Sequence, residues 1–295
     1  MQLSAFLEDT YAPLRQLAPK AIYQYRLTLR RFEEFLGRPP EVADLTDLQV
    51  QRFAQARKLS TSASTGKKDR THLQALANLA ARKRLLAEFL ALPPMRAPGR
   101  APRAYTAVEV AKLIRASRAM PGLVGNVKRG IWWASLLRAM WEDGERIGAH
   151  RELRWGDVDL DGCWITFPAE ARKGHVRDIR RRISPELAAW LRTFAGSERA
   201  LVWAWPGCET AIWNTFNRLC KRLGITARGF HGFRKASATY VAMAGGDPSA
   251  HLDHSDPRLA KRHYLDESIM SGQSALDFLP PLDLDGPLPP EEPAS

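Results

Sequence analysis

Residues 229–264 read GFHGFRKASATYVAMAGGDPSAHLDHSDPRLAKRHY. This stretch holds two polar motifs, His231-Gly-Phe-Arg234 and a run from His254-Ser-Asp to Tyr264. The histidine and the arginine of the first motif are three positions apart, which places them on one face of a helix. Both side chains can therefore reach the same anionic group.

A third motif lies upstream, where Gly144-Glu-Arg146-Ile-Gly precedes Leu153-Arg-Trp155. It adds a second arginine to the set. The guanidinium groups of Arg146 and Arg234 can each bind two phosphate oxygens in a fixed plane, which the point charge of a lysine cannot do. Attack on a phosphodiester needs such stabilisation because negative charge builds up in the transition state.

Together the motifs resemble the two catalytic boxes of the tyrosine recombinase family, to which phage integrases, Cre and the Xer recombinases belong. The resemblance covers roughly residues 104–268, and more weakly the first domain, which is similar to the family's core-binding domain. The matching positions are Arg146 for the first box, Lys173 for the β-hairpin lysine, His231 and Arg234 for His-x-x-Arg, Leu252-Asp-His254-Ser255 for Leu-Gly-His-Ser, and Tyr264 for the nucleophile.

The resemblance implies a mainly α fold with a small β-sheet, in which a helical, SAM-like core-binding domain precedes an α+β catalytic domain. It implies a site-specific recombinase or integrase that cuts and rejoins DNA through a 3′-phosphotyrosyl bond. The DNA on which such a recombinase acts belongs to a phage, an integron, a transposon or a chromosome dimer. No metal, ATP or other cofactor is implied. The implied partners are double-stranded recombination sites and further copies of the chain, two on one site and four in a synapse.

A tyrosine hydroxyl with its ordinary pKa near 10 is a poor nucleophile, because ionising it at pH 7 costs about 4 kcal/mol. We expect His231 to assist removal of the proton from Tyr264, while the cationic pocket favours the phenolate. By resemblance, Lys173 is the general acid for the leaving 5′ oxygen, and His254 hydrogen-bonds the phosphate.

The chain also departs from the family pattern. The acid usually found three residues after the first arginine is replaced by Ala149, so we expect Glu142 or Glu145 to support Arg146. Asp253 stands where the family has glycine. The interval from the last histidine to the tyrosine is ten residues instead of the commonest nine.

The net charge indicates a polyanionic partner, because the chain has 44 Lys and Arg but 32 Asp and Glu, and its pI is near 10. Five acids and no bases lie in residues 271–295, so residues 1–270 carry a net charge of +17. A solvated surface, a ribosome or an anionic lipid would also fit such a charge, but the motifs favour nucleic acid. We predict DNA contacts from eight cations: Lys67, Lys68, Arg70, Arg96, Arg100, Arg103, Arg180 and Arg182.

Apolar spacing divides the chain into four parts: a helical DNA-clamp domain (1–92), a basic, proline-rich linker (93–104), a catalytic domain (105–270) and an acidic, proline-rich tail (271–295). In the first domain, helices are predicted at 22–36 and 46–58. A third helix follows the turn at 60–66 and runs to residue 92.

In the second domain, the capping box from Thr106 to Glu109 predicts a helix through residue 118. A helix at 126–141 is apolar almost all round and should be buried. Strands are predicted at 163–167 and 176–183, on either side of a turn at Lys173-Gly174. Further helices begin at Ser184.

Three rival interpretations remain at this stage. One is a DNA-binding relative that has lost catalysis, and another is an enzyme similar to type IB topoisomerases. A metal cluster of His251, Asp253, His254 and His263 is the third, but its spacing fits no common zinc pattern.

The cysteines are odd in number and form no CxxC pair, so neither a disulfide framework nor a structural zinc site is expected from Cys163, Cys208 and Cys220. The sequence has no run of about 18 apolar residues and no signal-peptide pattern. We therefore expect a cytoplasmic, nucleoid-associated protein.

Overall fold

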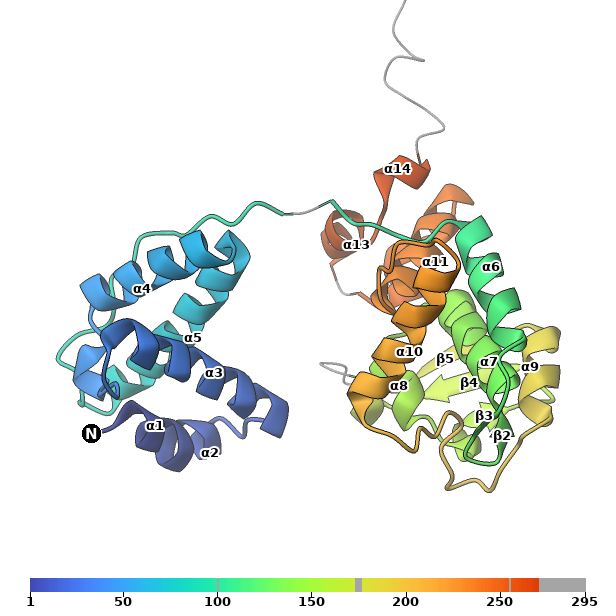
Figure 1. Ribbon diagram of the computed structural model, residues 1–295, viewed down its shortest axis with the longest axis horizontal. Helices are drawn as coiled ribbons and strands as arrows, with labels where there is room; N and C mark the ends of the chain where they lie inside the picture. The colour runs from blue at the N-terminus through green and yellow to red at the C-terminus, as the bar shows by residue number, and fades with distance from the viewer. Residues whose placement is uncertain (100, 173–176, 255, 271–295) are drawn as a thin grey trace, which may run out of the picture. The chain divides into compact units, whose positions relative to one another are not determined.

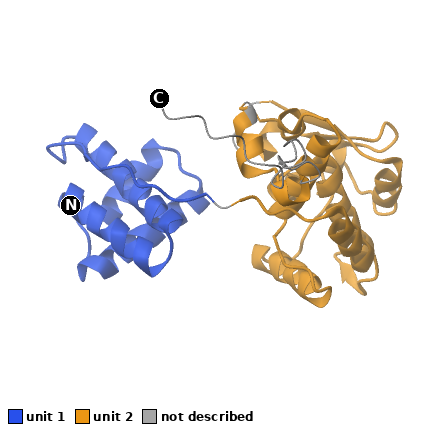
Figure 2. Cartoon of the chain, turned by 90° about the horizontal axis from the view of Figure 1, so that it is seen from above, with its two compact units in different colours: residues 1–100 blue, residues 101–295 orange. Residues whose placement is uncertain are grey.

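The computed structural model of the chain describes residues 1–99, 101–172, 177–254 and 256–270 (Figure 1). The chain forms two compact units, Met1–Arg100 and Ala101–Ser295, which Figure 2 shows in different colours. The division falls inside segment 93–104, the predicted linker, whose described residues contain neither helix nor strand. Among the described residues, no helix is both long enough and apolar enough to cross a membrane.

The helices of unit 1 are α1 (Leu3–Ala5), a π-helical turn (Phe6–Tyr11), α2 (Ala12–Leu14), α3 (Pro19–Leu36), a 3-10 turn (Val42–Asp44), α4 (Asp47–Ser60) and α5 (Ala63–Arg82). The helices predicted at 22–36 and 46–58 are confirmed as α3 and α4. Gly37 ends α3 in the left-handed conformation, with φ 71°, and the Thr46 side chain caps α4 by accepting the amide of Gln49.

The prediction of a helix to residue 92 is wrong, because α5 ends at Arg82. Arg84 adopts a left-handed φ of 59°, and the amide of Leu85 bonds the carbonyl of Ala80, which closes the helix end. Three apolar residues of segment 85–92 then pack back on the core of unit 1: Leu86, Leu90 and Leu92.

The elements of unit 2 are α6 (Ala107–Arg118), β1 (Leu123–Val124), β2 (Val127–Lys128), α7 (Arg129–Asp143), α8 (Ile147–Glu152), a 3-10 turn (Trp155–Asp157), β3 (Val158–Asp159), β4 (Trp164–Phe167), a 3-10 turn (Ala169–Ala171), β5 (Ile179–Arg182), α9 (Pro185–Arg192), α10 (Glu209–Arg222), α11 (His231–Met243), α12 (Pro248–Leu252), α13 (Pro257–His263) and α14 (Glu267–Met270). The chain is therefore mainly helical with small antiparallel sheets, as predicted.

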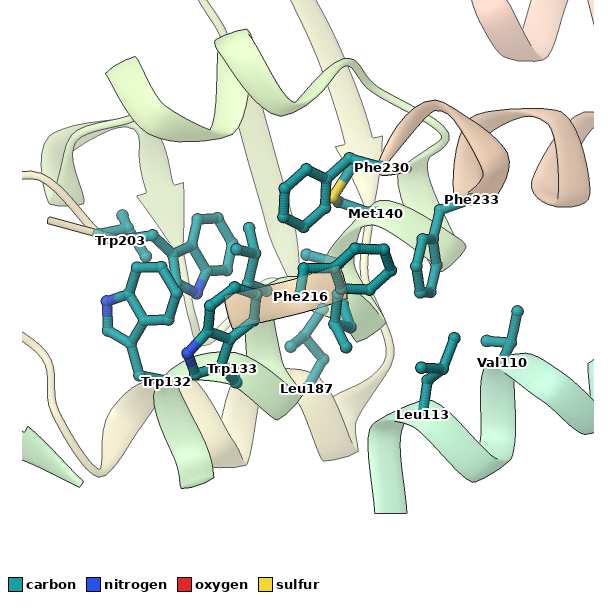
Figure 3. Packing of buried hydrophobic residues seen from close by; sticks show 14 of the residues in the cluster. Val110, Leu113, Trp132, Trp133, Met140, Leu187, Trp203, Phe216, Phe230 and Phe233 are labelled. Atoms are coloured by element: carbon teal, nitrogen blue, oxygen red, sulfur yellow. The ribbon is translucent and has the colours of Figure 1, made fainter. Parts of the chain in front are cut away.

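Helix α7 runs through the core of unit 2, as its apolar pattern predicts. Its Trp132 and Trp133 are almost completely buried, and Phe230 stacks on Trp133 with ring centres 6.2 Å apart (Figure 3). The helix begins at Arg129 instead of the predicted residue 126, because residues 123–128 form the hairpin of β1 and β2. Burying one phenylalanine of this core contributes about 1.5–3 kcal/mol.

The sheet has the order β3-β4-β5, and all its pairs are antiparallel. Strand β4 begins one residue later than predicted, because Cys163 has a left-handed φ of 59°. Strand β5 is shorter than predicted, and the described residues 177 and 178 lie outside it. Along β5 the side chains of Arg180 and Arg182 are exposed, whereas that of Arg181 is turned toward the interior.

Candidate active site

The structure brings together five of the predicted catalytic side chains from separate segments of unit 2. Arg146 precedes α8, and His231 and Arg234 lie in the first turn of α11. His254 follows α12, and Tyr264 directly follows α13. These five side chains, called the pocket below, therefore come together through the packing of unit 2 rather than through one local motif.

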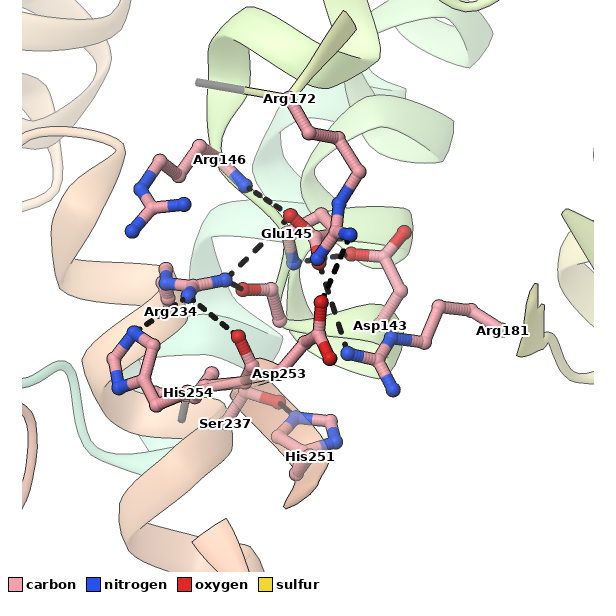
Figure 4. A network of polar contacts seen from close by, with 12 residues as sticks. Asp143, Glu145, Arg146, Arg172, Arg181, Arg234, Ser237, His251, Asp253 and His254 are labelled. Carbon is pink, nitrogen blue, oxygen red and sulfur yellow. Dashed lines mark hydrogen bonds and ion pairs between the residues drawn. The ribbon is translucent and has the colours of Figure 1, made fainter. Parts of the chain in front are cut away.

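Arg234 is completely buried, and Figure 4 shows it between Glu145 and His254. Its Nη1 donates to the carbonyl of Gly144 at 2.7 Å, and its Nη2 donates to the carbonyl of Leu252 at 3.0 Å. The same Nη2 lies 3.1 Å from Nε2 of His254. The guanidinium stands 5.2 Å from the centre of the Tyr264 ring. These contacts hold the positive charge of Arg234 in one orientation, against the tyrosine.

Glycine is required at position 144 for two reasons. The residue has φ 66°, which glycine adopts without strain, and it ends α7. A Cβ atom there would lie 2.6 Å from Nε2 of His251 and 3.2 Å from a methyl group of Leu252. The glycine of the Gly-Glu-Arg motif thus lets the end of α7 approach α12, so that its carbonyl can accept the Arg234 bond.

Tyr264 lies inside the pocket with 8% of its surface exposed. Its ring centre is 5.2 Å from that of His231 and 4.8 Å from that of His254. The neighbouring His263 is exposed. The interval of ten residues therefore places the tyrosine, and not the histidine before it, against the other pocket residues.

His231 is exposed at its surface, yet crowding by protein atoms around the imidazole is the main cause that lowers its pKa to about 4. The positive charges of Lys235, Arg234 and Arg146 add to this shift. The imidazole is therefore neutral at pH 7 and can accept a proton. This is the state that a general base beside Tyr264 requires.

Next to Arg234 lies the buried carboxylate of Glu145, which is 1% exposed. Its Oε1 accepts Nη2 of Arg172 at 2.9 Å, and its Oε2 lies 3.6 Å from Nη1 of Arg234. Burial would raise the pKa of Glu145, but the positive charges of Arg234, Arg172 and Arg181 together lower it below its ordinary value. Glu145 is therefore a buried anion that neutralises part of the cationic cluster.

Asp253 is a second carboxylate in the network. Its Oδ1 accepts Nη2 of Arg177 at 2.9 Å, and its Oδ2 accepts Nη1 of the buried Arg172 at 3.0 Å. The hydrogen bond from Arg177 is the main cause that holds the pKa of Asp253 well below its usual range. The bond and charge of Arg172 act in the same direction, against burial.

A buried pair supports the main chain around Arg146. Nε2 of His150 lies 2.9 Å from Oδ2 of Asp143, and Nδ1 of His150 lies 3.1 Å from the Arg146 carbonyl. Oδ1 of Asp143 accepts the amide of Glu145 at 2.8 Å. Burial opposes a charge on His150, but Asp143 outweighs it and raises the His150 pKa.

The sequence profile of the phage integrase family matches residues 105–269, which is more than half of the chain. The chain belongs to the phage integrase family. The matched range contains every residue of the pocket described above.

Individual relatives agree with the family. The tyrosine recombinase XerC of Xanthomonas campestris pv. campestris is 25% identical over 164 residues, which are 53% of this chain and 48% of that protein. The chain thus spans about half the length of this curated relative. A lambda integrase dimer bound to a COC′ core site has a TM-score of 0.69, with 20% identity over 90% of this chain and 78% of that chain. The Tn1549 transposon integrase bound to circular intermediate DNA has a TM-score of 0.66, with 12% identity over 89% and 95%. These two structures show that the fold is shared.

The departure from the phage integrase pattern at Ala149 can now be explained. Glu142 does not support Arg146, because it binds Arg138 at 2.6 Å and the amide of Ser184 at 2.7 Å. The main chain of Arg146 is held by His150 at its carbonyl and by Glu145, whose Oε2 accepts its amide at 3.4 Å. Of the two carboxylates expected to help, Glu145 contacts Arg146, and Glu142 binds Arg138 and Ser184.

Sequence reasoning missed Arg172, Arg181 and the Asp143–His150 pair. Arginines next to a turn are usually solvated, and neither Arg172 nor Arg181 stands in a recognisable motif. One signal was available in the sequence, because Asp253 stands where the family pattern has glycine. In the structure this residue has φ 51°. An aspartate at a position where glycine fits better indicates that its carboxylate makes contacts that offset the backbone strain.

Two predicted residues, Lys173 and Arg100, lie outside the described residues, as does Ser255 of the Leu-Asp-His-Ser element. Arg70 is only 7% exposed, and its contact with DNA stays a prediction. The other predicted DNA-binding cations are exposed, namely Lys67, Lys68, Arg96, Arg103, Arg180 and Arg182.

Proposed function

We propose that this chain is a site-specific DNA recombinase that cuts and rejoins strands through a 3′-phosphotyrosyl bond to Tyr264. The observation that carries the proposal is the placement of Tyr264 against His231, His254 and Arg234 in one pocket. A tyrosine beside a neutral imidazole and a buried guanidinium suits attack on a phosphodiester. The DNA-bound states of the lambda and Tn1549 integrases support DNA as the substrate.

The scissile phosphate would bind between Arg146 and Arg234. Burial lowers the pKa of Arg234, Glu145 opposes this, and the nearby charge of Arg146 lowers the pKa further. Two guanidinium groups that repel each other across a pocket are stabilised by an anion placed between them. Phosphate oxygens supply that anion, and negative charge building up in the transition state strengthens the interaction.

In the forward step, the Tyr264 oxygen forms a bond to phosphorus while the bond from phosphorus to the 5′ oxygen breaks. The phenolic proton passes to His231, whose low pKa keeps it neutral beforehand. The 5′ oxygen takes a proton from Lys173, a role that rests on the family resemblance. In rejoining, the 5′ hydroxyl attacks the phosphotyrosine and the tyrosine leaves. The energy of the broken strand is kept in the new bond, so the cycle uses no ATP.

The exposed cations would hold the duplex through its phosphates, and such contacts dominate affinity in proteins of this charge. We further propose two copies on one site and four in a synapse. A strand exchange needs four cuts, and each chain supplies one tyrosine. The lambda integrase structures, a dimer on a core site and a tetramer on a Holliday junction, support this assembly. Such a protein would work in the cytoplasm at the nucleoid.

The proposal is tested with a nicked recombination site whose freed 5′ end diffuses away after cleavage. The wild type should become linked to DNA through a bond that survives boiling in detergent. Tyr264→Phe keeps the ring and its packing but lacks the attacking oxygen, so it should bind DNA normally and form no adduct.

Tyr23→Phe is the matched control, because Tyr23 is 56% exposed on α3, and it should form the adduct at the wild-type rate. Adduct formation by Tyr264→Phe would overturn the assignment. A wild type that binds its site but forms no adduct would indicate a relative without catalysis, and relaxation of DNA at single sites would indicate a topoisomerase.

A further inference from the structure

The turn after α12 has an unusual backbone at Asp253. This residue has φ 51° and ψ 50°, a left-handed conformation that glycine adopts most readily. The conformation lets both neighbours of Asp253 face Arg234. The Leu252 carbonyl accepts Nη2 of Arg234 at 3.0 Å, and Nε2 of His254 lies 3.1 Å from the same nitrogen.

The side chain of Asp253 points to a different element. Its two carboxylate oxygens bind Arg172 and Arg177, the described residues on either side of segment 173–176. Nη1 of Arg172 also lies 3.4 Å from the Arg177 carbonyl. Arg172 is completely buried at its side chain and Arg177 is 75% exposed, so the bond to Arg172 is the one shielded from water.

Glu145 connects the contacts around Arg234 with those around Arg172. It binds Nη2 of Arg172 at 2.9 Å and lies 3.6 Å from Nη1 of Arg234. The contacts therefore form a closed ring, from the Asp253 side chain through Arg172, Glu145 and Arg234 back to the Leu252 carbonyl and the His254 imidazole, on either side of Asp253 (Figure 4). Carboxylates and guanidinium groups alternate around the ring.

We infer that Asp253 is a positioning residue, which fixes Arg234 and His254 for phosphate binding by tying their turn to Arg172 and, through it, to Glu145. This inference rests on the proposed function of the pocket. A glycine at this position would adopt the left-handed conformation with less strain but would remove both bonds to arginines. The aspartate is thus explained by the ring and not by the turn alone.

The test compares Asp253→Gly and Asp253→Asn with the wild type. Glycine removes the strain of the left-handed conformation together with the carboxylate. Asparagine also tolerates that conformation, removes the charge and replaces one of the two acceptor oxygens by an amide donor. The rate of adduct formation is measured in a single turnover at saturating nicked DNA, beside the Kd for DNA and the Tm.

We expect both variants to react about ten to a hundred times more slowly than the wild type, because small misplacements of catalytic groups have effects of this size. The Kd should stay within about twofold of the wild type, since Arg234 and His254 remain present. Asp256→Asn is the matched control. Asp256 lies on the same turn, and its exposed side chain caps the amide of Arg258, which asparagine also does. It should react at the wild-type rate.

A double variant distinguishes a positioning role of Asp253 from a purely structural one. Combining Asp253→Asn with Glu145→Gln should slow the reaction by much less than the product of the two single effects, because both substitutions open the same ring. The inference is overturned if Asp253→Gly reacts as fast as the wild type, or if the rate falls only in proportion to the loss of folded protein. If the wild type itself forms no adduct, the proposed function fails instead.

Discussion

Each unit contains a buried carboxylate that contacts several arginines. A histidine and a tyrosine lie near each of these clusters. In unit 1, Asp69 binds Nε of Arg57 at 2.8 Å and lies 3.5 Å from Nη1 of Arg31. His72, next to this cluster, stacks on Tyr25 with ring centres 4.3 Å apart. Unit 2 has the corresponding groups around Glu145, so the two clusters share their composition.

Their tyrosines lie in different environments. Burial and the hydrogen bond to the Tyr11 hydroxyl raise the pKa of Tyr25, which makes its oxygen a poorer nucleophile. The Tyr264 ring instead lies under the guanidinium of Arg234 and against two histidines. Under the proposed function, residue types alone do not distinguish the nucleophile from Tyr25, whereas the position of a guanidinium over the ring does.

Removing one arginine from each cluster gives the largest expected difference. Arg234→Ala should slow adduct formation by about a hundredfold to a thousandfold, because it removes charge-assisted bonds made most strongly in the transition state. Arg57→Ala should lower the stability of unit 1 by about 3 kcal/mol, since Asp69 loses a buried partner. The rate per folded, DNA-bound molecule should not change. Equal loss of rate in both variants would mean that the clusters do not differ in function.

Exposed arginines that bind no carboxylate among the described residues should differ from both clusters in how their contribution to DNA binding depends on salt. Replacing Arg180 and Arg182 by glutamine should make the slope of log affinity against log salt shallower by about 2, and should weaken binding about tenfold at moderate salt. Arg38→Gln is the control, because Arg38 is exposed but already bound to Asp44 at 2.9 Å. If the slope stays the same in the double variant, these arginines do not contact phosphates.

The smallest effect concerns pH. With a pKa of about 4, His231 is neutral from pH 5.5 to 7, so the rate of adduct formation should change by less than about twofold over this range. A histidine with the ordinary pKa of 6.5 would give a change of about eightfold. A profile with its midpoint near 6.5 would contradict the assigned environment of His231.

The free energy of unfolding should also depend on the protonation of His231. The unfolded chain binds protons at His231 below about pH 6.5, whereas the folded chain does so only near pH 4. The free energy of unfolding should therefore fall as the pH drops from 6.5 toward 4. His251, whose pKa is also lowered to about 4 mainly by burial, adds to this loss. Chemical denaturation at several pH values measures the effect.

Local patterns in the sequence predicted much of the fold. Capping residues and apolar spacing predicted α3, α4, α6 and α7, because such signals act within a few residues. The end of α5 was not predictable in this way, since a non-glycine residue, Arg84, takes the left-handed conformation and the following leucines pack on distant helices. Tertiary packing overrides local preference there.

The same limit applies to the pocket. His231, Arg234, His254 and Tyr264 stand in motifs, and the structure brings them together. Arg172 stands in no motif, and its burial between Glu145 and Asp253 depends on three segments meeting. Ion pairs of this kind are set by the packed fold, so spacing along the chain could not reveal them.

The most direct test of the account is to identify the residue that becomes linked to DNA. The wild-type adduct formed on the nicked site is digested with trypsin and nuclease, and the peptide that keeps a nucleotide is sequenced by mass spectrometry. Cleavage after Arg262 should release a linked peptide that begins at His263 and carries the nucleotide on Tyr264. A nucleotide on Tyr25, or on any residue other than Tyr264, would contradict the account.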